Sequence, residues 1–226
     1  MKNNLVELIF ILDRSGSMCG LEEDTIGGFN SMIERQKKEE GEAIVTTVLF
    51  DDEYELLHDR INIKGISSIT NREYYVRGTT ALLDAIGRTI KKIENVQKNT
   101  LEEARAGKVL FVITTDGMEN SSRIYSYEKI KKIIEDKKKE LGWEFIFLGA
   151  NIDAVKAAES IGISEERATN YNCDSEGTML NYEVISETVS SFRANKNISN
   201  NWKSKIENDY RKRGVKKFKR GEYIKG

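Results

Sequence analysis

The sequence lacks proline altogether and has little cysteine. An average soluble chain of this length would carry roughly 11 prolines, at about 5% usage, whereas these 226 residues contain none. Turns must therefore be built from Gly, Asn, Asp and Ser, and proline-rich recognition roles are excluded. The two cysteines, Cys19 and Cys173, are too few for a disulfide framework, so we expect a reducing compartment and a cytoplasmic protein.

Long apolar runs are missing as well. No stretch approaches the ~20 apolar residues that span a bilayer, and residues 1–4 lead into a strand pattern without the apolar segment of a signal peptide. Hydrophobic residues make up 38% and charged residues 32% of the chain, a balance typical of a soluble globular protein. We therefore expect no contact with a membrane.

The chain as a whole also lacks an excess of one sign of charge, although its two parts do not. The net charge is -1, which predicts no global attraction to nucleic acid. Residues 196–226 hold 11 basic and 3 acidic side chains, a net charge of +8, which leaves -9 for residues 1–195. We expect one domain over 1–195 and a basic C-terminal extension over 196–226, helical near 200–213 and docked through Trp202, Ile206 and Tyr210. Single-stranded nucleic-acid binding is the alternative role for this extension, since aromatic and basic residues alternate in it.

The chain does contain a regular succession of strand and helix patterns. The apolar run at 5–12 is typical of a strand buried on both faces, and the acidic turn at 51–53 predicts a hairpin. Strands are expected at 5–12, 43–50, 54–58, 108–114, 144–148 and 168–171, and helices at 21–39, 81–96, 127–141, 154–161 and 178–192. This order predicts an α/β fold: a doubly wound, mainly parallel six-stranded sheet with one antiparallel edge strand and helices on both faces.

Polar side chains follow two strands of this sheet. Asp13 ends the first strand, and Asp116 follows the strand at 108–114. If the strand order is 3-2-1-4-5-6, these two strands are neighbours where the order reverses, and ligands bind at that crevice in such sheets. Ser15 and Ser17 follow Asp13 at alternate positions, so a tight loop can turn three oxygen-bearing side chains toward one point. Such hard oxygen ligands suit Mg²⁺ or Mn²⁺, with Ca²⁺ also possible, and no Cys/His set for Zn²⁺ exists.

Three motifs in the chain resemble those of von Willebrand factor A domains. Residues 13–17 (DRSGS) are similar to the DxSxS motif of the metal-ion-dependent adhesion site (MIDAS), residues 78–86 (GTTALLDAI) to the family's second loop, and residues 114–117 (TTDG) to its third loop. The match covers about residues 4–193. A closer likeness is to a group of bacterial intracellular proteins consisting of little beyond this domain, which share the stretches at 24–30, 79–90 and 143–151.

The resemblance implies a set of metal ligands. Ser15, Ser17 and Thr80 would bind the ion through their hydroxyls, and Asp13 and Asp116 would bind it directly or through water. Thr79 is the competing residue in the second loop, although the alignment of residues 82–85 with the family favours Thr80. In the family, the remaining coordination position accepts a carboxylate from a partner protein. Gly78-Thr79 departs from the family's two glycines.

Each feature also has a simpler interpretation. Ser15 or Ser17 could merely cap a helix. The acidic residues 51–53 are better explained as a hairpin turn than as a second cation site, and His58 has no nucleophile within sequence reach. Cys19 is expected to be a small packing residue. Glu119 and Asn120 either hydrogen-bond the loops of the site or are ordinary surface residues.

The leading hypothesis is a non-enzymatic, divalent-metal-dependent protein-binding module, in which Mg²⁺ accepts an acidic side chain from an unknown protein partner. One alternative is a Mg²⁺-dependent phosphoryl-transfer enzyme, because phosphatases of the haloacid dehalogenase type also begin with an Asp at the end of the first strand. Those enzymes need a second Asp two positions later, where this chain has Ser15. A further alternative is a nucleic-acid or scaffold protein that acts through the basic extension.

Overall fold

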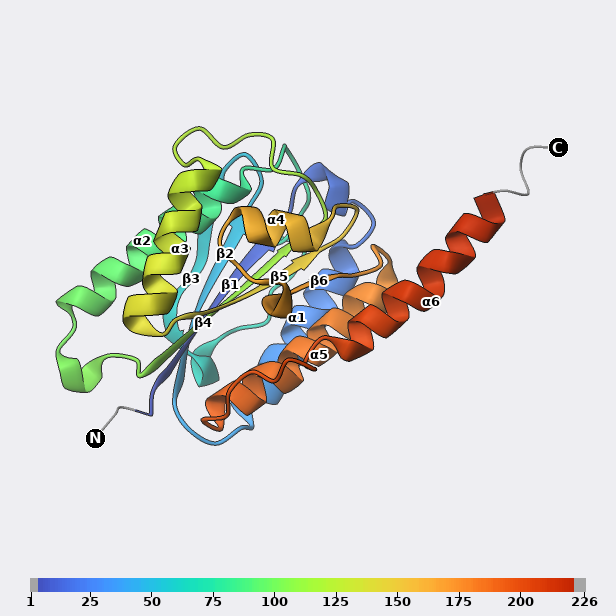
Figure 1. The fold of residues 1–226 in the computed structure, drawn as a ribbon. Coiled ribbons are helices and arrows are strands. Elements are labelled where there is room, and N and C mark those ends of the chain that lie inside the picture. Colours follow the sequence, from blue (N-terminus) through green and yellow to red (C-terminus); the bar gives the residue numbers. More distant parts are fainter. Residues whose placement is uncertain (1–3, 222–226) are drawn as a thin grey trace.

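Six strands form one sheet in the computed structural model, which describes residues 4–221 (Figure 1). Their order across the sheet is β3-β2-β1-β4-β5-β6, and only the β2–β3 pair is antiparallel. The strands are β1 (Val6–Asp13), β2 (Ala43–Phe50), β3 (Tyr54–Asn62), β4 (Lys108–Thr115), β5 (Glu144–Gly149) and β6 (Ala168–Asn170). The predicted fold class is confirmed, and the strand order is the one on which the expected proximity of Asp13 and Asp116 depended.

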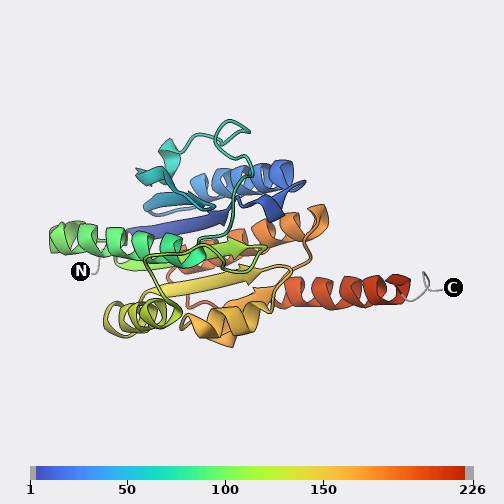
Figure 2. The same ribbon diagram turned by 90° about the horizontal axis from the view of Figure 1, so that it is seen from above.

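Helices cover both faces of the sheet (Figure 2). One face packs against α1 (Glu22–Lys37) and α5 (Ser175–Arg193), and the other against α2 (Leu82–Asn99), α3 (Tyr127–Leu141) and α4 (Ala154–Ser160). All eight residues of β1 are buried, because this central strand has neighbours on both sides and helices above and below. Its side chains alternate between the faces: Leu8 and Phe10 join the α1–α5 core, whereas Ile9 and Ile11 join the other.

A sixth helix, α6 (Ser204–Gly221), lies beside α5. Ile206 is buried in the core on that side, and the indole Nε1 of Trp202 donates a hydrogen bond of 2.8 Å to the carbonyl of Glu166. These two contacts agree with a docked extension. Tyr210 does not, because 40% of its surface is exposed. The helix runs past the end of α5 (Figure 1), and residues 222–226 of the predicted extension lie outside the described residues.

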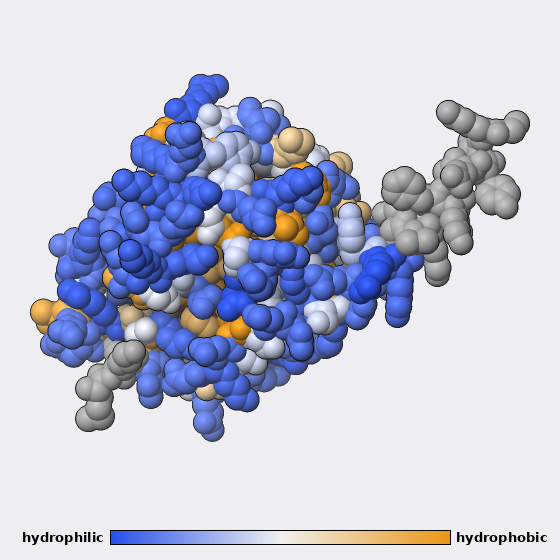
Figure 3. Space-filling model, in the orientation of Figure 1, coloured by the Kyte–Doolittle hydropathy of each residue, from blue (hydrophilic) through white to orange (hydrophobic). Residues whose placement is uncertain are grey.

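The remaining differences from the predicted elements are local. Strand β3 continues to Asn62, and four 3₁₀-helical turns at 16–18, 63–65, 102–104 and 165–167 were not predicted. None of the helices within residues 4–221 combines the length and the apolar character needed to cross a membrane. The face in Figure 3 is mostly hydrophilic, with apolar residues in small groups, as the abundance of charged residues predicts.

The topology brings two loops together at one edge of the sheet. Strand β1 pairs in parallel with β2 on one side and with β4 on the other, and Leu12 lies opposite Thr114. The carboxyl ends of β1 and β4 therefore meet at the point where the strand order reverses, which is where doubly wound sheets bind ligands.

Candidate metal site

Three loops meet at this edge, and backbone hydrogen bonds join them. The amide of Gly16, in the loop after β1, donates to the carbonyl of Gly78 in the loop before α2 (3.2 Å). The amide of Asn120, in the loop after β4, donates to the carbonyl of Thr80 (3.0 Å). Gly78 has a φ of 64°, and a Cβ there would lie 1.8 Å from Oδ1 of Asp52, so only glycine fits this junction without strain.

Asp13 is buried at the end of β1, and both of its carboxylate oxygens accept hydrogen bonds. Oδ1 accepts from the Ser15 amide at 2.7 Å, and Oδ2 accepts from the Thr115 hydroxyl at 2.6 Å. Burial raises the pKa of Asp13 to about 6, and the nearby charge of Asp116 adds to the rise. Two hydrogen bonds thus fix the position of the Asp13 carboxylate, but its surroundings do little to balance its negative charge.

Asp116 lies beside Asp13 and is also buried, with 1% of its surface exposed. Its Oδ1 accepts a hydrogen bond of 2.5 Å from the Ser17 hydroxyl, which in turn lies 3.1 Å from the Ser15 hydroxyl. Burial raises the pKa of Asp116 as well. The two serines of the first loop and the aspartate of the third loop therefore form one connected group.

Thr80 completes the group from the second loop. The hydroxyls of Ser17 and Thr80 converge on Gly117: a Cβ placed there would lie 3.1 Å from Ser17 Oγ and 3.3 Å from Thr80 Oγ1. Thr80 is buried. The hydroxyl of Thr79, in contrast, bonds to that of Ser121 in an exposed position, so Thr80 is the threonine of this loop whose hydroxyl lies near that of Ser17.

The chemistry of this group fits a hard divalent cation. The five predicted residues offer two carboxylates and three hydroxyls, which are the oxygen donors that Mg²⁺, Mn²⁺ and Ca²⁺ prefer. Among the side chains that the structure describes, those of residues 4–213, no salt bridge reaches Asp13 or Asp116, although buried carboxylates normally have a cationic partner. No group of three or more His, Cys, Asp or Glu residues within that range is arranged to hold a metal, so hydroxyl groups must complete any coordination at this site.

Side chains around the group hold its loops in place. The Asn120 side chain accepts a hydrogen bond from the Thr80 amide (2.9 Å), and the Glu119 carboxylate accepts from the amides of Leu83, Ser121 and Ser122. Both residues therefore hydrogen-bond the loops, as one of the two predictions stated. Asp84 does the same for the amides of residues 123–125; its place in the GTTALLDAI stretch was the available sequence signal.

A fourth loop, between β6 and α5, contributes a residue that the sequence did not indicate. The thiol of Cys173 donates a hydrogen bond of 3.7 Å to Oδ2 of Asp116. Burial, followed by the charge of Asp116, raises the pKa of this thiol to about 11. The thiol is therefore protonated at neutral pH. Only the spatial arrangement of β6 beside β5 brings it to the site.

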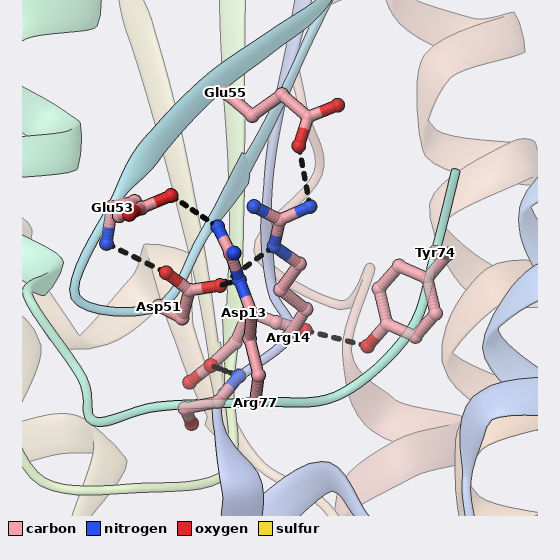
Figure 4. Close-up of polar contacts among 8 residues, drawn as sticks. Asp13, Arg14, Asp51, Glu53, Glu55, Tyr74 and Arg77 are labelled. Atoms are coloured by element: carbon pink, nitrogen blue, oxygen red, sulfur yellow. Dashed lines mark hydrogen bonds and ion pairs between the residues drawn. The ribbon is translucent and has the colours of Figure 1, made fainter. Parts of the chain in front are cut away.

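The other residues singled out in the sequence have structural environments. Asp51 begins the predicted hairpin turn, and it forms salt bridges with Arg14 and Arg77 (Figure 4). His58 is buried against Phe29, with parallel rings whose centres are 6.4 Å apart. The prediction for Cys19 was wrong: this residue is exposed, because the 3₁₀ turn before it and the exposed Gly20 after it carry it away from the core.

The chain resembles known proteins in its fold rather than in its sequence. No family model and no curated protein sequence matches this chain. A von Willebrand factor type A structure from Catenulispora acidiphila matches at 13% identity with a TM-score of 0.57, over 84% of this chain and 43% of that one. Proximal thread matrix protein 1 from the mussel byssus, with a zinc-occupied MIDAS motif, matches at 14% identity with a TM-score of 0.56, over 84% and 47%.

A third similar structure is the manganese-loaded TRAP protein of Plasmodium vivax, with 18% identity and a TM-score of 0.54 over 80% of this chain and 72% of that one. This chain spans less than half of the length of the first two structures. At these identities the likeness shows the fold alone. The chain has the fold of von Willebrand factor type A domains, as its motifs predicted.

Proposed function

We propose that this chain is a metal-dependent protein-binding domain, in which Asp13, Ser15, Ser17, Thr80 and Asp116 hold a divalent cation, Mg²⁺ in the cell. The observation that carries the proposal is the convergence of three loops on two buried carboxylates that no Lys or Arg within residues 4–213 neutralises. Two similar structures carry manganese or zinc, the latter in a MIDAS motif. Their ions support a cation at the corresponding edge of this sheet.

The proposed partner is a protein that presents an acidic side chain. Three of the five ligands are neutral hydroxyls, and the resemblance allows Asp13 and Asp116 to bind through water, so a divalent cation held in this way keeps much of its positive charge. A bound cation would therefore supply an electrophilic centre that attracts an anionic group. The loops around Ser17, Thr80 and Gly117 would surround that group and determine which partner fits.

The hydrogen bonds of Asp13 favour binding over catalysis. A phosphatase of the haloacid dehalogenase type needs a nucleophilic aspartate and a second aspartate two positions later as general acid, and this chain has Ser15 at that second position. Both oxygens of Asp13 are engaged, one by the Ser15 amide and one by the Thr115 hydroxyl. We therefore propose that the domain is not an enzyme.

Metal binding is the first test. Electron paramagnetic resonance of free Mn²⁺, with Mg²⁺ as competitor, should show one bound ion per chain. Replacing Asp116 by Asn should weaken binding at least a hundredfold. The matched control is Asp153→Asn: Asp153 also follows a parallel strand, but it caps α4, a role that Asn fills equally well, and its only salt bridge in the described residues is an exposed one with Lys156. This control should stay within twofold of wild type; an equal loss in both variants would contradict the site.

Partner binding is the second test. The wild-type chain and Asp116→Asn, each with Mg²⁺ and with EDTA, are used to capture proteins from extracts of the source cell. We expect a partner that is retained only by wild type with Mg²⁺, and whose binding is lost when its own acidic residue is replaced by the amide. Equal capture in EDTA would contradict the proposed function.

A further inference from the structure

A cluster of charged side chains lies directly beside the candidate metal site, and the proposed ligand set does not use it. We call Arg14, Asp51 and Arg77 the charge hub (Figure 4). Oδ2 of Asp51 accepts hydrogen bonds from Nε of Arg14 and from Nε of Arg77, each at 2.8 Å. The side chains of Arg14 and Asp51 are fully buried, and that of Arg77 is 37% exposed. One carboxylate therefore binds two guanidinium groups.

The two arginines of the hub belong to the loops that carry the hydroxyl ligands. Arg14 lies between Asp13 and Ser15, and Arg77 comes three residues before Thr80. The backbone repeats this connection: the Arg77 amide donates to the Arg14 carbonyl (2.9 Å), and the amide of Ala81 donates to the Asp51 carbonyl (2.8 Å). Asp51 thus holds the first loop through its side chain and the second loop through both its side chain and its backbone.

The orientation of Asp51 is itself fixed. Its Oδ1 accepts a hydrogen bond of 2.6 Å from the Glu53 amide in the hairpin turn. Glu55 binds Nη1 of Arg14 at 2.6 Å, and Glu53 binds Arg77. The hairpin between β2 and β3 therefore serves as a rigid support from which Asp51 reaches both loops.

Stability alone does not explain this arrangement. A buried ion pair is often no more stabilising than apolar side chains of the same volume. Within the described residues, Nη2 of Arg14 is buried without a hydrogen-bond partner, and such a group costs stability. The pairing is better explained by the single arrangement that it imposes on the two loops.

We propose that Asp51 is a positioning residue of the metal site. By binding Arg14 and Arg77 at once, it fixes the loop of Ser15 and Ser17 relative to the loop of Thr80. A site made of neutral hydroxyls depends strongly on this alignment, because each hydroxyl contributes only when it lies at the right distance from the ion. This inference rests on the proposed function, since it concerns the same cation.

The test compares Asp51→Asn with a control of the same kind at the other end of the sheet. Glu7 is equally buried and binds Nε of Arg60 at 2.6 Å, but it lies six residues from Asp13 along β1, or ~20 Å at about 3.3 Å per residue. Mn²⁺ affinity is measured on the full chain by electron paramagnetic resonance, and stability by thermal unfolding. Asp51→Asn should weaken Mn²⁺ binding at least tenfold, whereas Glu7→Gln should change it less than twofold, although both variants unfold at lower temperature.

Each other result has a definite meaning. An unchanged affinity in folded Asp51→Asn, or an equal loss in Glu7→Gln, would overturn the positioning role while leaving the metal site intact. If Asp51→Asn does not fold, Arg77→Gln decides: at least a threefold loss, partly restored in Arg77→Lys, supports the role, and no loss overturns it. A wild-type chain that binds no Mn²⁺ would instead contradict the proposed function, and the positioning role with it.

Discussion

Each end of strand β1 carries a buried carboxylate, and the two carboxylates differ in whether a cationic side chain balances their charge. At the amino end, Glu7 is paired with Arg60 and accepts a further hydrogen bond from Gln97. At the carboxyl end, Asp13 is surrounded by an amide, a hydroxyl and a second carboxylate. A paired acid contributes to the fold, whereas an acid left without a cation disfavours it. The difference supports the proposed cation site at the carboxyl end of β1.

The largest predicted effect concerns the paired end. Glu7→Gln removes the acid that Arg60 binds and leaves a guanidinium without its counter-charge. We expect a loss of about 3 kcal/mol in the free energy of unfolding, measured by urea denaturation, with unchanged metal binding. If Glu7→Gln were as stable as wild type, the ion pair at the amino end of β1 would not stabilise the fold, and the contrast with Asp13 would be lost.

The unpaired end should respond in the opposite direction. Asp13→Asn removes a buried negative charge, and an amide can still accept from the Ser15 amide and donate to the Thr115 hydroxyl. Without metal at pH 7.5, we expect this variant to be more stable than wild type by about 1–3 kcal/mol, because one pKa unit corresponds to about 1.4 kcal/mol. Urea denaturation in EDTA measures the difference, and a destabilised variant would show that the Asp13 charge is compensated within the protein.

The same carboxylate predicts a pH dependence. The pKa of Asp13 is about 6 in the folded chain against 3.8 as its ordinary value, so between these values the folded state binds more protons than the unfolded state. The contribution of Asp13 to stability without metal should therefore fall as the pH rises from about 4 to 6 and level off above that. The advantage of Asp13→Asn over wild type should shrink by about 1–2 kcal/mol between pH 7.5 and pH 4.5. A constant advantage would exclude a raised pKa.

The smallest predicted effect concerns the two thiols near the carboxyl end of strand β1. Cys19 is exposed, whereas Cys173 is half-buried beside Asp116, with a pKa of about 11. Because the thiolate is the reactive form, iodoacetamide at pH 7.5 should modify Cys173 at least tenfold more slowly than Cys19. Mass spectrometry of the two peptides follows the rates. Equal rates would show that burial and the charge of Asp116 do not raise the pKa of Cys173.

Most of the fold and the proposed ligand set followed from local patterns. Apolar runs and helical periodicity gave the strands, and DRSGS, GTTALLDAI and TTDG indicated the three loops that the structure brings together. The contacts that the sequence did not predict join residues that lie far apart in the sequence. Nothing in the sequence pairs Asp51 with Arg14 and Arg77, or places Cys173 against Asp116. The exposure of Cys19 and Tyr210 depends on the direction in which the 3₁₀ turn and α6 leave the core.

The proposed place of Asp13 in a cation site is tested most directly by one measurement. The free energy of unfolding of wild type and Asp13→Asn is compared at pH 7.5 with EDTA and with saturating Mg²⁺. Metal binding to the folded chain stabilises it, so the sign of the difference should reverse: the variant is more stable without metal and less stable with Mg²⁺. The same sign under both conditions would contradict the account.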